Sequence, residues 1–261
     1  MRGEMAGPPE RLVRGLVDGP SVVAGFEWHD VVGSTNALAA QAARRSVPEV
    51  WVVAADVQTA GRGRLGRRWT APPGTSLMCS LVLRPPVSSA WPLVPLLAGL
   101  ALAEAVGPFA PAAAVAAKWP NDLLIGGRKA GGILAEVVGE AVVVGIGLNV
   151  DWRGVARPAD LATATSLAEA AGAPVDRWRV FAALIGVFGN RYRAWRAAPT
   201  AFLGDYRARC ATIGRPVSVE RPGAPPLRGM AEDVTERGGL RVRDADGTAE
   251  EVLAGDVEHV R

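Results

Sequence analysis

Cysteine is scarce in this chain, and its scarcity excludes several classes of protein. The 261 residues include only two cysteines, Cys79 and Cys210. Two cysteines cannot build the disulfide framework of a small secreted domain, and neither belongs to the C-x-x-C pattern of a metal or redox site. Hydrophobic residues make up 49% of the chain and charged residues 21%, proportions that suit a globular protein with a sizeable core. We therefore expect a reduced, cytoplasmic globular protein.

Long apolar runs are also lacking. Residues 1–9 contain no apolar stretch of the kind that a secretory signal needs. The apolar run at residues 91–103 is shorter than the roughly 20 residues of a membrane span. It is also interrupted by Pro92 and Pro95 and is followed by Glu104. The sequence therefore predicts neither a signal peptide nor a membrane association.

Lysine occurs only at Lys118 and Lys129, although lysine and arginine together number 29. This preference for arginine fits a GC-rich coding bias, so the arginine count alone says little. The net charge is +3, and the acidic residues nearly balance the basic ones. Such a balance disfavours a nucleic-acid-binding module, which would carry a basic face and bind DNA in a salt-dependent way. Both lysines fall within residues 116–136, and this segment is therefore a candidate site of chemistry.

Three glycines and four arginines are interleaved in residues 58–69, which we call the glycine–arginine loop. The segment reads Q-T-A-G-R-G-R-L-G-R-R-W and follows an apolar run, residues 50–57, that predicts a buried strand. Glycine lets the backbone approach a ligand closely, and the planar guanidinium of arginine suits carboxylate and phosphate oxygens. We therefore expect the loop to fold over a small anionic ligand and to be mobile until a ligand orders it.

The loop also contains the spacing G-x-G-x-x-G, which is shared with dinucleotide-binding folds. In those folds the third glycine opens a helix whose N-terminus receives the pyrophosphate. Here Gly66 is soon followed by Pro72-Pro73-Gly74, which ends any helix. An acidic ribose ligand on the next strand is missing as well. The sequence thus argues against a nicotinamide dinucleotide site.

The lysine-containing segment, residues 116–136, is predicted to be a hairpin. Residues 119–122, Trp-Pro-Asn-Asp, form a turn, and Gly126-Gly127 marks the tip between two apolar strands. Lys129 then lies near the start of the second strand, where Gly131-Gly132 leaves room for a ligand. The alternative interpretation is a solvated hairpin end.

Two further groups of polar residues admit two interpretations each. Ser34-Thr35-Asn36 precedes a predicted helix, residues 37–44, and could cap it or bind a polar ligand head. Asn149 lies in an apolar strand, residues 142–150, where an unpaired amide would cost about 1–3 kcal/mol. Its partner is either a structural group or a ligand.

The predicted elements divide the chain into three parts. Residues 1–24, rich in glycine and proline, are expected to be a flexible N-terminal segment, too small for a helix-turn-helix domain. Residues 25–212 contain the expected strands 26–32, 50–57, 76–83 and 142–150 and the expected helices 37–44, 91–106, 165–171 and 176–196. Residues 213–261 contain five short runs that suggest a small β-barrel-like domain, at residues 217–220, 227–234, 240–242, 250–253 and 257–260.

Taken together, these motifs resemble the bacterial biotin–protein ligases, also called biotin–[acetyl-CoA-carboxylase] ligases. The matching pieces occur in the family's order across residues 26–152 and are residues 34–36, the glycine–arginine loop, residues 118–122, residues 128–136 and residues 145–149. The combination of G-R-G-R-x-G with K-W-P-N-D is very specific. The resemblance implies an α+β fold: a mixed sheet flanked by helices, like the class II synthetases, followed by a small SH3-like β-barrel.

The resemblance also implies an activity. In that family an ATP-dependent ligase converts biotin and MgATP into biotinyl-5′-AMP and transfers biotin to one lysine of the biotin carboxyl carrier domain of a carboxylase. The implied catalytic residues are Lys129, Arg64, Asp122 and Lys118. The implied biotin-binding residues are Ser34, Thr35, Asn36, Gln58, Arg62, Gly63, Arg64 and Lys129. The implied nucleotide-binding residues are Arg62, Arg64, Trp69, Lys118, Asn121 and Asn149, and Asp122 is the candidate ligand of Mg²⁺.

Two departures from the family pattern bear on function. Many members carry an N-terminal winged-helix domain and repress biotin operons. Only about two dozen residues precede the first predicted strand here, so we expect a form without that domain and without specific DNA binding. Position 65 is leucine where some relatives have arginine.

The nearest rival is a lipoate–protein ligase, which shares the fold and the adenylation chemistry. Such an enzyme is expected to have a glycine-triplet loop and a strand that contains histidine. This chain has G-R-G-R-L-G, and its two histidines, His29 and His259, lie outside the motifs. We expect both histidines to be surface or structural residues.

Overall fold

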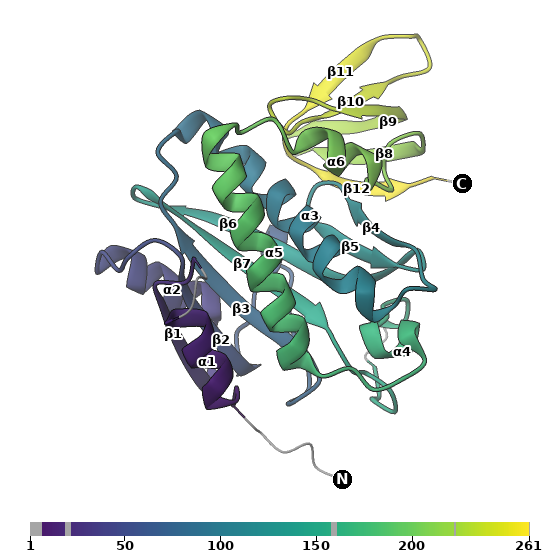
Figure 1. Ribbon diagram of the computed structural model, residues 1–261. Helices are drawn as coiled ribbons and strands as arrows, with labels where there is room; N and C mark the ends of the chain where they lie inside the picture. The colour runs from purple at the N-terminus through teal and green to yellow at the C-terminus, as the bar shows by residue number, and fades with distance from the viewer. Residues whose placement is uncertain (1–6, 19–21, 158–160, 222, 261) are drawn as a thin grey trace.

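The computed structural model describes residues 7–18, 22–157, 161–221 and 223–260. Within these residues, a seven-stranded sheet has the order β1-β2-β3-β7-β6-β5-β4 (Figure 1). β1 and β2 run parallel and are joined by α2 (Thr35–Arg44), whereas the other neighbouring strands are antiparallel. The strands are β1 (Gly25–Val32), β2 (Trp51–Gln58), β3 (Ser76–Leu83), β4 (Val115–Lys118), β5 (Asp122–Ile125), β6 (Arg128–Val138) and β7 (Ala141–Asn149). The sheet is therefore mixed, as the sequence predicts.

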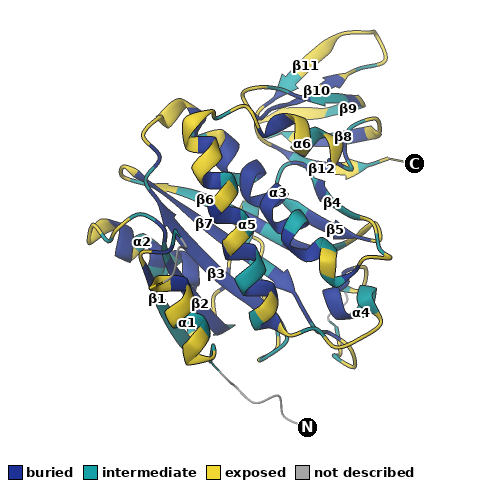
Figure 2. Ribbon diagram, viewed as in Figure 1, coloured by how far each residue is buried: buried dark blue, intermediate teal, exposed yellow. Residues whose placement is uncertain are grey.

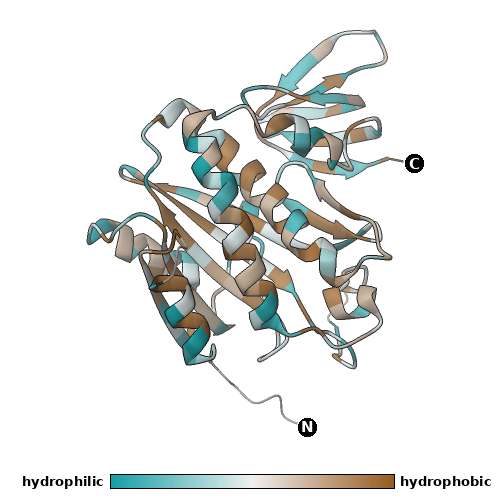
Figure 3. Ribbon diagram, viewed as in Figure 1, coloured by the Kyte–Doolittle hydropathy of each residue, from teal (hydrophilic) through white to brown (hydrophobic). Residues whose placement is uncertain are grey.

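Helices cover both faces of this sheet. α3 (Val94–Val106) and α5 (Arg177–Ala197) pack on one face and α2 packs on the other. Successive residues of a strand point to opposite faces. Val144 of β7 therefore joins the core beneath α3 and α5, whereas Val143 joins the core beneath α2. The strands are buried and apolar where they are covered, and α5 is buried only on its inner side (Figures 2 and 3).

The apolar run around α3 is a core helix. In the part of the chain that the structure describes, Ser88–Phe109 is the one helical segment long and apolar enough to cross a membrane by length and composition. Of its most apolar 18-residue window, 67% is buried inside the protein. It begins as a 3₁₀ helix, η2 (Ser88–Leu93), and packs as α3 against α5 and β6. Its apolar character is explained by this packing.

Three elements are not predicted from the sequence: α1 (Glu10–Val17), β4 and α6 (Leu203–Ala208). α1 lies in the N-terminal segment for which no element is expected. It is amphipathic, it buries Leu16, and it packs against α5 and β1. β4 is half alanine, a residue that strands disfavour, and α6 spans only six residues, too few for a helical period to be distinguished. A short α4 (Leu167–Ala171) lies within the predicted helix 165–171.

The C-terminal strands form a second, antiparallel sheet in the order β11-β10-β9-β8-β12 (Figure 1). They are β8 (Pro216–Arg221), β9 (Ala224–Val234), β10 (Leu240–Arg243), β11 (Ala249–Val252) and β12 (Asp256–His259), and they correspond to the five predicted runs. No pairing joins β11 to β12 among the described strands, so the expected SH3-like domain does not close into a barrel. Trp119 connects the two sheets, because its indole N–H donates to the carbonyl of Gly238, between β9 and β10, at 2.9 Å. The domain boundaries at residues 24/25 and 212/213 stay predictions.

A buried ion pair holds the strand that leads into the glycine–arginine loop. Asp56, 1% exposed near the end of β2, accepts a hydrogen bond from the guanidinium of Arg177 at the start of α5. The same carboxylate oxygen accepts the backbone N–H of Gly74 at 3.0 Å, beyond the far end of the loop. The guanidinium also lies beside the edge-to-face pair of Trp28 and Trp178, at 5.5 and 4.7 Å from their ring centroids. Asp56 therefore connects both ends of the loop to the helical layer.

We expect Asp56→Ala to lower the free energy of unfolding by about 3–5 kcal/mol, because it leaves a buried guanidinium without its carboxylate. Urea denaturation followed by tryptophan fluorescence measures the change. Glu10→Ala is the matched control, because Glu10 forms an exposed ion pair with Arg14 on α1. Removing an exposed pair of this kind costs about 0.5 kcal/mol or less. Equal losses in the two variants would contradict the role given to Asp56.

Candidate functional site

A cavity of about 750 Å³ lies on the α2 face of the first sheet, beneath the glycine–arginine loop. This volume is within the range of small-molecule sites. Segments far apart in the sequence form its walls: the start of α2, the loop, residues 118–122, strands β6 and β7, and β12 of the second sheet. All the predicted site residues line it, namely Ser34, Thr35, Asn36, Gln58, Arg62, Gly63, Arg64, Trp69, Lys118, Asn121, Asp122, Lys129 and Asn149. Their individual roles stay predictions.

Glycines on β7 keep the floor of this cavity free of side chains. A Cβ atom added to Gly145 would lie 2.0 Å from Oδ1 of Asn36, and one added to Gly147 would lie 2.5 Å from the ring of Trp69. Both distances are far below van der Waals contact. The two glycines alternate with Val144 and Ile146, which point into the opposite core. The missing side chains therefore let Asn36 and Trp69 lie directly on the sheet.

A hydrogen-bonded group of polar side chains forms the inner end of the floor. Gln58 Oε1 accepts the backbone N–H of Thr35 at 2.7 Å and its hydroxyl at 3.1 Å. The buried Ser80 hydroxyl is 2.8 Å from the Thr35 hydroxyl and 2.6 Å from Oδ1 of Asn36. Ser34 caps α2 by accepting the backbone N–H of Ala37, as one of the two interpretations expects, and the residue also lines the cavity. Ser80 is absent from the predicted site residues because it lies in the strand Ser76–Leu83, away from the motifs.

The glycine–arginine loop is a tight turn over the cavity, not the start of an α-helix. The backbone N–H of Gly63 donates to the carbonyl of Arg67 at 2.7 Å, across a single 3₁₀ turn, η1 (Arg64–Gly66). Leu65 has φ = 54°, a left-handed conformation that is uncommon for a residue other than glycine. No α-helix follows Gly66 in the described chain before α3. The loop therefore lacks the helix that a dinucleotide fingerprint requires after its third glycine.

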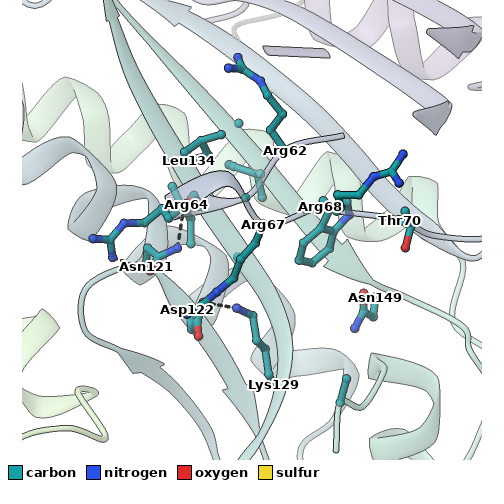
Figure 4. A pocket seen from close by; sticks show the side chains of 18 of the residues that line it. Arg62, Arg64, Arg67, Arg68, Thr70, Asn121, Asp122, Lys129, Leu134 and Asn149 are labelled. Atoms are coloured by element: carbon teal, nitrogen blue, oxygen red, sulfur yellow. Dashed lines mark hydrogen bonds and ion pairs between the residues drawn. The ribbon is translucent and has the colours of Figure 1, made fainter. Parts of the chain in front are cut away.

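The arginines of the loop point in different directions (Figure 4). The Arg62 guanidinium donates to Glu136 of β6 at 2.9 Å, on the side away from Lys129. Arg64 donates to Oδ1 of Asn121 at 3.0 Å, and Arg67 pairs with Asp256 of β12. The loop is thus fastened to the first sheet on one side and to the second sheet on the other.

Lysine and arginine side chains gather in the cavity around the carboxylate of Asp122. Lys129 Nζ lies 2.6 Å from Oδ1 of Asp122 (Figure 4). Burial lowers the pKa of Lys118, and the neighbouring Lys129 lowers it further, while Asp122 acts in the opposite direction. Burial also lowers the pKa of Arg64. Because these cations are partly desolvated and only partly neutralised, the site favours an anionic ligand.

The other end of the cavity is aromatic and has unpaired polar atoms. The ring of Trp69 lies over Gly147, and its buried N–H has no hydrogen-bond partner among the described residues. Asn149 donates its amide N–H to the carbonyl of Thr165 at 2.9 Å, but its buried Oδ1 has no partner there. Asn149 therefore combines both interpretations of the sequence: its nitrogen is a structural donor, and its oxygen is a free acceptor beside a flat aromatic surface. Such an end suits a heterocyclic base that carries an amino group.

The C-terminal sheet contributes a wall that the sequence motifs do not reveal. Asp256, Val257 and Glu258 of β12 line the cavity. His259, on the same strand, lies 3.4 Å from the Thr212 hydroxyl and is close enough to Lys118 for the two charges to interact. Burial and the nearby cations lower the pKa of His259 to about 4, so it is neutral at pH 7. The expectation of a structural histidine agrees with this packing, although the residue lies beside the site.

Comparisons with known proteins identify the family. Residues 28–151 match the model of the Biotin/lipoate A/B protein ligase family, and residues 212–260 match that of the Biotin protein ligase C terminal domain. A biotin–[acetyl-CoA-carboxylase] ligase of Mycobacterium tuberculosis is 42% identical over 97% of both chains. This chain belongs to the biotin–protein ligases. A second biotin–[acetyl-CoA-carboxylase] ligase, from Paracoccus denitrificans, is 34% identical over 82% of this chain and 92% of its own length.

Solved structures agree with this assignment. The biotin–protein ligase of Aquifex aeolicus in complex with biotin and ATP superposes with a TM-score of 0.78 at 28% identity. The match covers 91% of this chain and 99% of that one. A biotin–protein ligase from Leishmania major in complex with biotinyl-5-AMP is 27% identical with a TM-score of 0.58. The predicted family and its fold are therefore confirmed, and the chain is an enzyme of the biotin–[acetyl-CoA-carboxylase] ligase family.

Proposed function

We propose that this ligase activates biotin with MgATP and then transfers the biotinyl group to a lysine of a biotin carboxyl carrier domain. In the first step a carboxylate oxygen of biotin attacks the α-phosphorus of ATP, and pyrophosphate leaves. In the second step the amine of the carrier lysine attacks the acyl carbon of the adenylate, and AMP leaves. The observation that carries the proposal is the cavity itself. It brings together a group of polar side chains, a cluster of cations and an aromatic surface, which suit biotin, phosphate and adenine respectively.

Each part of the cavity would have its own task. Thr35 and Gln58, with Ser34, would bind the ureido end of biotin. Lys129 would lie between the biotin carboxylate and the α-phosphate, where it offsets the repulsion of two anions and stabilises charge on the phosphoryl oxygens. Arg64, Lys118 and Asn121 would hold phosphate oxygens. Trp69 and Asn149 would bind adenine, by stacking and through the free Oδ1 acceptor.

The donor set fits magnesium that arrives with the nucleotide. Mg²⁺ is usually held by one or two carboxylates together with substrate phosphates. The described residues contain no group of three or more His, Cys, Asp or Glu that could hold a metal ion by themselves. Asp122 is the carboxylate at the cationic centre and would supply a protein ligand, while Mg²⁺ would offset charge on the phosphates. Asp122 could equally orient the incoming lysine, and its pairing with Lys129 is compatible with either task.

The remaining partners follow from the family and the fold. We propose a carrier domain of an acetyl-CoA or acyl-CoA carboxylase as the protein substrate, a cytoplasmic location, and no specific DNA binding. The related ligase/repressor of Bacillus subtilis is 40% identical, but the alignment covers 53% of that protein. Its repressor activity is therefore not carried over to this chain.

The test is mass spectrometry after incubation with biotin, ATP and Mg²⁺, first without and then with a carrier domain. We expect biotinyl-adenylate in the first reaction and addition of one biotinyl group to the carrier in the second. Lipoate replaces biotin in the parallel reaction, because the matched family model also includes lipoate ligases. An adenylate from lipoate and none from biotin would overturn the proposed substrate.

A further inference from the structure

A continuous chain of hydrogen bonds runs from the floor of the cavity to the outside of the glycine–arginine loop. It begins at Gln58, which accepts the backbone N–H of Thr35, and passes through the hydroxyls of Thr35 and Ser80 to the side-chain oxygen of Asn36. The buried Asn36 uses its whole amide within the protein. Its oxygen faces Ser80, and its nitrogen donates to the carbonyl of Leu134 at 3.2 Å and to Oε2 of Glu136 at 2.7 Å. Asn36 is therefore better placed to orient its neighbours than to bind a ligand itself.

Glu136 is the point where this chain of hydrogen bonds meets the loop. Its Oε2 accepts from Asn36 at 2.7 Å and from the Arg62 guanidinium at 2.9 Å. Glu136 lies near the C-terminal end of β6 and does not line the cavity of about 750 Å³. Arg62 is directed away from Lys129 and Asp122 (Figure 4). In this arrangement Glu136 acts on the loop through Arg62 and not on a ligand.

The loop needs such attachments because its own structure is weak. Leu65 is 64% exposed and has a left-handed backbone, so it has neither buried apolar contacts nor a relaxed conformation to hold the turn in place. On one side the loop is attached through Arg62 to Glu136. On the other side Arg64 and Arg67 attach it to residues 121, 255 and 256. Loss of the attachment at Glu136 would free the side of the loop next to the polar inner end of the cavity.

We propose that Glu136 is a positioning residue that keeps the glycine–arginine loop closed over the bound ligand. This inference rests on the proposed function, because the ligand in question is biotin or its adenylate. A ligand bound on the floor of the cavity fixes the side chains of Thr35 and Gln58. The hydrogen bonds through Ser80 and Asn36 then fix the Glu136 carboxylate, which holds Arg62. Closure of the loop retains the adenylate until the carrier arrives.

The experiment compares Glu136→Ala, Glu136→Gln, Arg62→Ala and the double variant Glu136→Ala/Arg62→Ala. The preformed adenylate complex is diluted into excess unlabelled biotin, and release of labelled adenylate is followed over time. We expect release to be about two- to fivefold faster in each single variant than in wild type, as for loss of one partner of a half-exposed ion pair. Release from the double variant should be no faster than from either single variant, because all three changes break the same contact. In Glu136→Ala and Glu136→Gln the KM for biotin should rise, while single-turnover adenylation at saturating substrate stays within about twofold of wild type, because the groups at the reacting atoms are unchanged.

Glu232→Ala is the matched control. Glu232 forms an exposed ion pair with Arg243 on the C-terminal sheet, away from the loop. Glu232→Ala should leave the release of adenylate and the KM for biotin unchanged. Glu136→Gln keeps a side-chain oxygen that can accept from Asn36 but lacks the negative charge that holds Arg62. It should therefore release adenylate faster without a change in melting temperature, which separates loop closure from general loss of stability.

Limited trypsin digestion gives a readout that does not depend on catalysis. Trypsin cleaves after the exposed Arg67 and Arg68 faster when the loop is open, so we expect faster cleavage in Glu136→Ala than in Glu232→Ala, with or without biotin. Wild-type release and cleavage in Glu136→Ala would overturn the inference. Fast release in Arg62→Ala alone would also overturn it, because Arg62 would then act on the ligand directly. If the wild-type protein forms no adenylate, the proposed function fails, and the digestion still decides whether Glu136 closes the loop.

Discussion

Adenylate formation is expected to fall by about 10²–10³-fold when Lys129 is replaced by alanine, the loss typical of removing one preorganised group that stabilises transition-state charge. Lys129 lies in the cavity 2.6 Å from Asp122, and its side chain is 42% exposed. A partly exposed side chain contributes little to the core, so the variant should fold normally. The loss should appear in the rate at saturating substrate more than in the KM for either substrate, because the charge that Lys129 opposes increases as the carboxylate attacks phosphorus. Pyrophosphate release under single-turnover conditions measures this rate.

The control for Lys129 is Arg228→Ala, which removes an exposed cation from β9 on the second sheet. It should retain wild-type activity. Lys129→Arg is informative as well, because a guanidinium keeps the charge but has a different shape and should restore only part of the rate. Wild-type adenylation by Lys129→Ala would refute the placement of Lys129 between carboxylate and phosphate. The first half-reaction would then have to depend on Lys118 and Arg64.

Replacement of Trp69 by alanine should raise the KM for ATP by about 10–100-fold, since stacking of one base on an aromatic ring is worth about 1–3 kcal/mol. The ring lies directly on Gly147 at the aromatic end of the cavity. Binding of biotin alone, measured by calorimetry, should change much less, because the polar inner end of the cavity is formed by Thr35 and Gln58. The two measurements together show which end of the cavity receives the base.

Gly147→Ala tests the same surface without removing the ring. The added Cβ would lie 2.5 Å from Trp69 and must displace it, so the KM for ATP should rise in this variant as well. Gly186→Ala on α5 is the control, because its added Cβ meets no atom within 4 Å. A loss of biotin affinity as large as the loss of ATP affinity would reverse the assignment of the two ends.

Motifs that are contiguous in sequence were sufficient to find most of the site. Gly61, Lys129 and Asn149 belong to short patterns whose residue types already suggest a ligand. The strands were predictable as well, because β-branched runs bounded by glycine are unambiguous. Ser76–Leu83, predicted from its alternation, is found with those bounds. β4 and α6 were not predictable, because β4 is half alanine, a residue that strands disfavour, and six residues do not establish a helical period.

The contribution of the second sheet could not be predicted. Arg67 and Asp256 are separated by 189 positions, and nothing in either local sequence indicates that they meet. The directions of side chains are equally hidden: the pattern G-R-G-R gives no sign that Arg62 faces Glu136 whereas Arg64 faces Asn121. Asn36 is a third case. Its place before a helix gives no sign that its amide bonds to Ser80, Leu134 and Glu136, and its contact with a ligand stays a prediction.

Because the chain contains only two lysines, few of its own side chains can be acylated by the biotinyl-adenylate that it forms. An acyl-adenylate acylates amines, and an intermediate that escapes would attack lysines near the mouth of the site. Here Lys118 and Lys129 both line the cavity, and every other basic side chain apart from the two histidines is arginine. A guanidinium stays protonated at physiological pH and is a poor nucleophile. The exterior of the ligase is thus almost free of acylable side chains, and an escaping adenylate has little to react with before it meets the carrier or water.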